Sequence, residues 1–134
     1  MGHDDTFLKD DFIMKSWKLH IIIPEIPPTN NQLLRLHWRD RSRLNKTWYW
    51  LIKESLMNND FDPKSIKFED KRTVKIVVYR KQISDIDNLY GGIKPVVDSL
   101  VKNDLLIDDG PKYCNLISEV CVDLNNQRTE IFIE

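Results

Sequence analysis

The acidic residues from position 85 to position 109 are the part of the chain best suited to chemistry. Six of its 21 acidic residues fall in this stretch, and the five that we take as candidates are Asp85, Asp87, Asp98, Asp108 and Asp109. Crowded carboxylates repel one another, and an ionised carboxylate removed from water is costly unless a positive charge lies near it. A hard divalent cation such as Mg²⁺ meets this need because it takes oxygen ligands and keeps several waters. The sequence therefore predicts a magnesium site of the kind that assists phosphodiester hydrolysis.

Two pairs within this stretch have spacings that favour a common target. Asp85 and Asp87 are two residues apart, so in an extended segment both carboxylates point the same way. Lys94 and Asp98 are four apart and share one face of a helix, where the ammonium group can offset charge on a phosphate. Taken singly, the pairs also fit a polar turn and a surface ion pair, and residues 108–110 fit a common turn. The prediction of a metal site depends on the occurrence of all three motifs in this order between residues 85 and 110.

The distribution of basic residues indicates a phosphate-rich substrate. The net charge of −1 argues against a protein that coats nucleic acid without specificity, but positive charge gathers over residues 35–53 and 71–81. We expect Trp48 and Leu51 in the first segment to be core residues. The candidates for phosphate contacts are Arg39, Arg41, Arg43, Lys46, Arg80 and Lys81.

The length of 134 residues indicates one domain over 17–134, preceded by a mobile or disordered extension over 1–16. No apolar run approaches the roughly 20 residues of a membrane span, so we expect no membrane association. The spacing of Cys114 and Cys121 matches no zinc or redox motif. Reduced thiols are the simpler interpretation, and they favour a cytoplasmic location.

Hydrophobic periodicity predicts an α+β domain with the element order β-α-β-α-β-β. The expected strands cover residues 17–23, 73–79, 116–124 and 129–133, and the expected helices cover 44–57 and 94–103. Three prolines argue against regular helix over 24–31, and residues 125–128 are expected to form a hairpin turn. These elements predict a two-layer domain in which two helices cover a mixed sheet of about four strands. The aspartates then come from a strand end, a helix and a loop, which can converge.

Three motifs resemble the signature of the RusA-type endodeoxyribonucleases, the Holliday junction resolvases common in bacteria and prophages. They are Asp85-Ile-Asp87-Asn88, Lys94-Pro-x-x-Asp98-x-Leu100 and Leu106-Ile107-Asp108-Asp109. Upstream, Pro27-Pro-Thr-Asn-Asn31 and His37-Trp38-Arg39 resemble the amino-terminal segment of that family. The resemblance extends from Trp17 to Glu134.

The resemblance implies roles for individual residues. Asp85, Asp87 and Asp109 match catalytic aspartates that bind Mg²⁺, with Mn²⁺ as an alternative ion. Lys94 matches the essential lysine, although it follows Asp87 at a wider spacing than in the best-known member. Asn88, Asp98 and Asp108 match positions expected to orient the metal ligands.

The same resemblance implies a homodimer that resolves four-way DNA junctions in recombination and repair. Two alternatives stay open. One is a non-catalytic member of the family that binds branched DNA. The other is a different metal-dependent phosphohydrolase that acts on nucleotides, although the chain lacks the repeated Glu-x-x-Glu pairs usual in nucleotide pyrophosphohydrolases.

Overall fold

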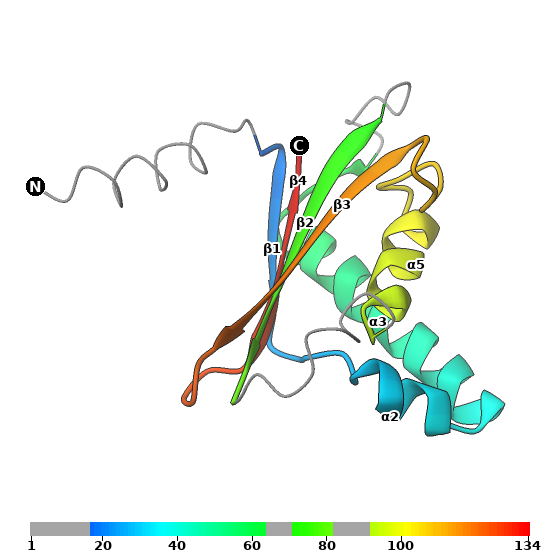
Figure 1. Ribbon diagram of the computed structural model, residues 1–134. Helices are drawn as coiled ribbons and strands as arrows, with labels where there is room; N and C mark the ends of the chain where they lie inside the picture. Colours follow the sequence, from blue (N-terminus) through cyan, green and yellow to red (C-terminus); the bar gives the residue numbers. More distant parts are fainter. Residues whose placement is uncertain (1–16, 64–70, 82–91) are drawn as a thin grey trace, which may run out of the picture.

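The computed structural model describes residues 17–63, 71–81 and 92–134. Asp85, Asp87 and Asn88 lie outside these ranges, as does the extension expected over 1–16. The described elements, shown in Figure 1, are β1 (Leu19–Ile23), α2 (Asn30–Arg35), α3 (Trp38–Asn58), β2 (Arg72–Arg80), α5 (Lys94–Lys102), β3 (Cys114–Val122) and β4 (Arg128–Ile133).

The four strands form one mixed sheet in the order β1-β4-β2-β3. β2 and β3 are parallel, whereas β4 pairs antiparallel with both β1 and β2. Parallel neighbours need a long crossover connection, and α5 lies in the connection from β2 to β3. The predicted α+β class and the mixed four-stranded sheet are confirmed.

The predicted hairpin at residues 125–128 is wrong, because the two strands that it joins do not pair. β4 lies between β1 and β2, so the connection from β3 passes the end of β2 before β4 begins. There the backbone N–H of Asp123 donates to the carbonyl of Arg80 at 2.8 Å. In its central position β4 is buried on both faces over residues 129–133, whereas residues of the edge strand β1 alternate between buried and exposed.

The core lies between the sheet and the two longer helices, α3 and α5, which lie side by side (Figure 1). Trp48, Ile52 and Leu56 recur every four residues and form the buried stripe of α3. Val96, Val97 and Leu100 form the stripe of α5. Each such side chain stabilises the fold by about 1.5–3 kcal/mol when it leaves water. Both stripes agree with the periodicity of the sequence.

α2 is a short helix that was not predicted, and its first two residues, 30 and 31, lie in the stretch over which no regular helix was expected. The three prolines remain outside it, and Thr29 caps its first turn. Thr29 Oγ1 accepts from the backbone N–H of Gln32 at 3.2 Å, and Gln32 Oε1 accepts from the backbone N–H of Thr29 at 2.9 Å. This reciprocal pair is a capping box, which satisfies backbone donors that the first helical turn leaves free.

α3 begins at Trp38, six residues before the predicted start. His37 caps it, because Nδ1 accepts from the backbone N–H of Arg39 at 3.2 Å. The first turns carry exposed charged side chains with no apolar stripe, so hydrophobic periodicity does not detect them. Within the described ranges, no helix has the combination of length and hydropathy that crossing a membrane requires.

Candidate active site

Lys94 is the centre of the candidate site. Its Nζ lies 3.6 Å from Oδ1 of Asp98 and 3.7 Å from Oδ2 of Asp109. Asp98 lies one turn further along α5, whereas Asp109 belongs to the connection that follows this helix. The side chains of Lys94, Asp98 and Asp109 are 64%, 30% and 38% exposed, so all three are accessible to a substrate.

The end of α5 explains how Asp109 reaches Lys94. Asp104 has a φ of 64°, and the backbone N–H of Leu105 donates to the carbonyl of Leu100 at 3.0 Å. This left-handed residue reverses the chain after the helix. Leu105 and Leu106 are then buried, so the returning segment is anchored against the core. The reversal brings Asp109 back alongside the amino-terminal turn of α5.

Asp108 holds the turn that carries Asp109. Its Oδ1 accepts from the backbone N–H of Asp109 at 2.8 Å, while both residues remain exposed. Cys114 follows at the start of β3. Burial raises the pKa of the Cys114 thiol above its ordinary value, and the Asp109 carboxylate adds to this rise. The negative charge of Asp109 therefore acts on the first residue of β3 as well as on Lys94.

A pocket of about 150 Å³ adjoins Lys94 where three helices meet. Its lining residues are Leu33 from α2, Arg41 and Asn45 from α3, and Lys94, Pro95 and Asp98 from α5. The pocket places Arg41, a candidate phosphate contact, next to Lys94. Asn45 was not among the predicted site residues, although it follows Arg41 by four residues and so shares its face of the helix.

The other candidate phosphate contacts lie in different surroundings. Arg39, Arg43 and Lys46 are exposed on α3, and Lys81 is exposed at the end of β2. Arg43 Nη1 lies 3.7 Å from Asp40 Oδ1. Arg80 is tied to the fold, because its Nη2 donates to the carbonyl of Pro27 at 2.7 Å, and burial lowers the pKa of its guanidinium. No signal in the sequence indicated this structural contact.

The carboxylates among the described residues suit a hard divalent cation, but they include only some of the predicted metal ligands. Asp98 and Asp109 both turn a carboxylate oxygen toward the ammonium group of Lys94. Carboxylate oxygens are also the ligands that a hard divalent cation takes. Among the described residues, no three acidic, histidine or cysteine side chains form a group able to hold a metal. Asp85 and Asp87 lie outside those residues and remain predicted ligands.

A comparison of the chain with protein-family models found no match, and a search of curated proteins found no significant match.

Proposed function

We propose that the chain is a Mg²⁺-dependent endodeoxyribonuclease that cuts four-way DNA junctions in recombination and repair. The resemblance of the motifs around Asp85, Lys94 and Asp109 to the RusA-type enzymes suggests this activity. The observation that carries the proposal is the meeting of Lys94, Asp98 and Asp109 beside a pocket that contains Arg41. Two cations and two carboxylates at one accessible place suit a phosphodiester better than an uncharged substrate.

The resemblance suggests the metal ligands, and the described contacts suggest the roles of Lys94 and Asp98. Asp85, Asp87 and Asp109 would hold the ion, which would supply an activated water and a polarised phosphate when bound. Lys94 offsets the charge that grows on the phosphate oxygens. Asp98 holds the ammonium group of Lys94 on the side where Asp109 also lies.

The proposed enzyme is a cytoplasmic homodimer. A four-way junction has approximate two-fold symmetry, so two equivalent cuts require two active sites related by a two-fold axis. Contacts to phosphates would supply most of the affinity. Junction binding should then weaken steeply as the salt concentration rises.

A supercoiled plasmid that extrudes a cruciform tests both the activity and the dimer. With Mg²⁺, we expect the wild-type protein to give linear plasmid, because both strands are cut within one binding event. We expect Asp109→Asn to bind a labelled junction with nearly unchanged affinity but to cut it at least ~100-fold more slowly. Dimers that combine one wild-type and one Asp109→Asn subunit should produce nicked circles.

The matched control is Asp104→Asn in the same connection. Asp104 is exposed with a φ of 64°, a conformation that asparagine also tolerates, so this variant should cut normally. Junction binding by the wild-type protein without cleavage would instead favour the branched-DNA-binding alternative. Hydrolysis of a nucleoside triphosphate beside uncut junction would favour the nucleotide phosphohydrolase.

A further inference from the structure

The corner between α2 and α3, residues 34–43, exposes a large aromatic side chain among cations. Trp38 is 67% exposed and Leu34 is 62% exposed, although apolar side chains of this size usually leave water. The guanidinium carbon of Arg39 lies 5.3 Å from the centroid of the Trp38 ring. The corner carries four arginines and one acidic residue: Arg35, Arg39, Arg41, Arg43 and Asp40.

The backbone of this corner is well fixed. The carbonyl of His37 accepts from the backbone N–H groups of Asp40 at 2.9 Å and Arg41 at 3.0 Å. Arg41 Nη2 donates to the carbonyl of Leu34 at 3.0 Å, which ties the start of α3 to the end of α2. The Trp38 backbone is therefore positioned before any ligand arrives, and little ordering entropy is lost on binding.

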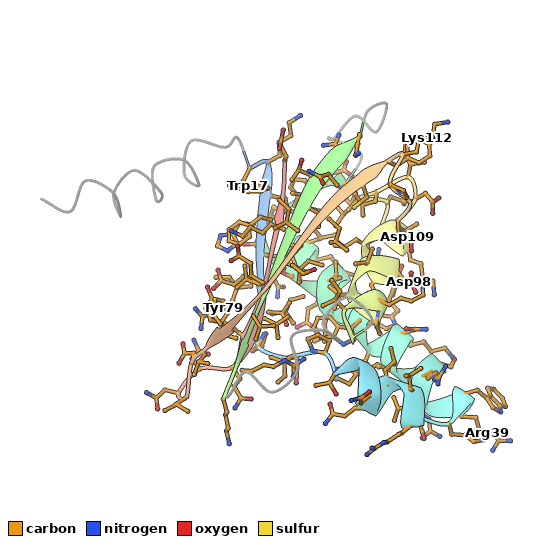
Figure 2. All side chains as sticks on the ribbon, in the orientation of Figure 1. Trp17, Arg39, Tyr79, Asp98, Asp109 and Lys112 are labelled. Atoms are coloured by element: carbon orange, nitrogen blue, oxygen red, sulfur yellow. The ribbon has the colours of Figure 1, made fainter. Side chains whose placement is uncertain are left out.

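The corner adjoins the candidate active site. Arg41 belongs both to the corner and to the pocket that contains Lys94 and Asp98. Figure 2 shows Arg39 at the end of α3 far from the sheet, and Asp98 on α5 further along the same side of the molecule. Positive charge thus extends from the corner into the pocket beside Lys94.

The chemistry of the corner selects a ligand that has both negative charge and a free aromatic face. An exposed tryptophan stacks on nucleobases of any sequence, and nearby arginines contact the phosphates on either side. Bases inside duplex DNA are already stacked on their neighbours and do not offer a free face. We propose that the α2–α3 corner binds an unpaired nucleotide of DNA, with Trp38 stacked on its base and Arg39 at its phosphate. The proposal rests on the proposed function only in taking DNA as the ligand, since such binding needs no metal ion.

Binding of a fluorescein-labelled oligothymidylate, measured by anisotropy in EDTA, tests the proposal without cleavage. Stacking contributes about 1–3 kcal/mol per base, so Trp38→Ala should weaken binding by about 5- to 150-fold. Trp38→Phe should retain most of the affinity because an aromatic face remains. The slope of affinity against salt should stay unchanged in Trp38→Ala and become shallower in Arg39→Gln.

Trp50 offers a matched control on the same helix. It is 59% exposed, and it lies about 18 Å further along α3 at 1.5 Å per residue. Trp50→Ala should bind the oligonucleotide like the wild-type protein. Equal affinity of Trp38→Ala and wild type, or an equal loss in both alanine variants, would overturn the proposal, as would failure of the wild-type protein to bind.

The two proposals can fail separately. Normal junction cleavage with oligonucleotide binding that does not depend on Trp38 would overturn the role of the corner and leave the nuclease in place. Binding that depends on Trp38, in a protein that cuts no junction, would support the corner and contradict the nuclease.

Discussion

At the scale of single residues, Lys94 has surroundings that suit function better than stability. Its ammonium group faces Asp98 and Asp109 at 3.6 and 3.7 Å, yet all three side chains are open to solvent. Exposed ion pairs at such distances contribute about 0–1 kcal/mol because water screens the charges. Holding a cation between two carboxylates therefore contributes little to folding, but it places that cation where a phosphate can reach it.

Lys94→Gln separates these two roles. We expect the free energy of unfolding in urea to change by less than about 0.5 kcal/mol, since only exposed pairs are lost. Junction cleavage should fall by about 100-fold or more, since the ammonium group that offsets phosphate charge beside Asp109 is lost. The control is Lys102→Gln in the last turn of α5, an exposed lysine outside the site. Full cleavage by Lys94→Gln would remove Lys94 from the mechanism.

At the scale of elements, Asn103 joins α5 to α3, the two helices that carry Lys94 and Arg41. Asn103 is buried at the end of α5, and its Nδ2 donates to the carbonyl of Tyr49 on α3 at 3.1 Å. The same group donates to the carbonyl of Ser99 at 2.9 Å. This amide therefore caps α5 and links the end of that helix to α3.

Asn103→Ala should destabilise the protein, and Asn59→Ala provides a matched comparison. Both asparagines follow the last residue of a helix and donate to a serine carbonyl four residues back, but Asn59 is exposed. We expect Asn103→Ala to lower the free energy of unfolding by about 1–3 kcal/mol, because a buried side chain loses its hydrogen bonds to the carbonyls of Tyr49 and Ser99. We expect Asn59→Ala to cost under about 0.5 kcal/mol. Equal losses in urea titrations would contradict the proposed joint.

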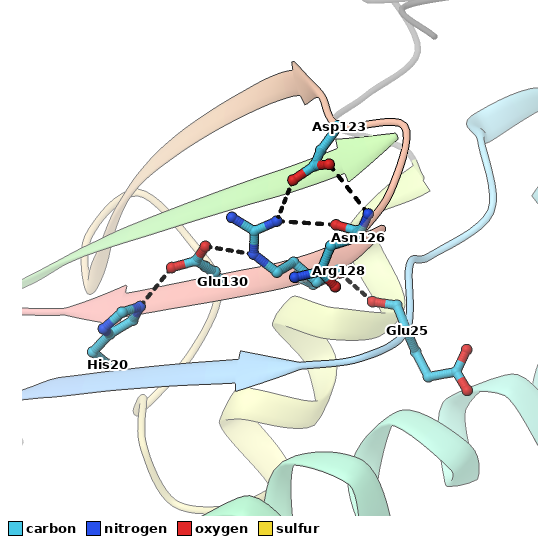
Figure 3. A network of polar contacts seen from close by, with 7 residues as sticks. His20, Glu25, Asp123, Asn126, Arg128 and Glu130 are labelled. Atoms are coloured by element: carbon cyan, nitrogen blue, oxygen red, sulfur yellow. Dashed lines mark hydrogen bonds and ion pairs between the residues drawn. The ribbon is translucent and has the colours of Figure 1, made fainter. Parts of the chain in front are cut away.

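At the scale of the whole molecule, a polar network links strands on the face of the sheet turned away from α3 and α5 (Figure 3). His20 Nε2 on β1 lies 2.8 Å from Glu130 Oε1 on β4. Arg128 donates to Glu130 Oε2 and to Asp123 Oδ2, both at 2.9 Å. Because Asp123 lies in the connection from β3, the network holds that connection to the strands beyond β2.

Because of this network, the stability of the folded protein should fall at acid pH. The hydrogen bond from Arg128 and the backbone N–H groups of Asn125 and Asn126 hold the pKa of Asp123 below its ordinary value of 3.8. A carboxyl whose pKa falls on folding stabilises the folded state fully above its unfolded pKa, and this contribution disappears as pH falls through the folded pKa. Asp123→Asn should therefore be less stable than wild type at about pH 6, and the difference should shrink below about pH 3.8.

Thermal unfolding followed by circular dichroism across this pH range measures the effect. The control is Asp60→Asn, an exposed aspartate with a φ of 52° that asparagine can also adopt. This variant shows what the loss of an exposed aspartate outside the network does to stability. A gap between Asp123→Asn and wild type that widens as the pH falls would contradict the assigned pKa direction.

Local signals predicted most of the elements, but not how the strands are ordered. The buried stripes of α3 and α5 follow from spacings within a few residues, so periodicity detects them. The Thr29–Gln32 capping box is also a local signal, and reading it would have found α2. The position of β4 has no such signal. A turn at residues 125–128 fits either a hairpin or a connection that passes a third strand, so the hairpin prediction was wrong.

The sequence by itself determined most of the segments that become helices or strands, and it placed Lys94 and Asp98 on one helix face. Only the tertiary structure decided that Asp109 meets Lys94, that Arg41 lines the same pocket, and that β4 separates β1 from β2. The physical reason is the range of the forces involved. Helix and strand patterns depend on neighbours within one or two turns, whereas contacts between distant segments depend on how all the apolar faces can be buried at once.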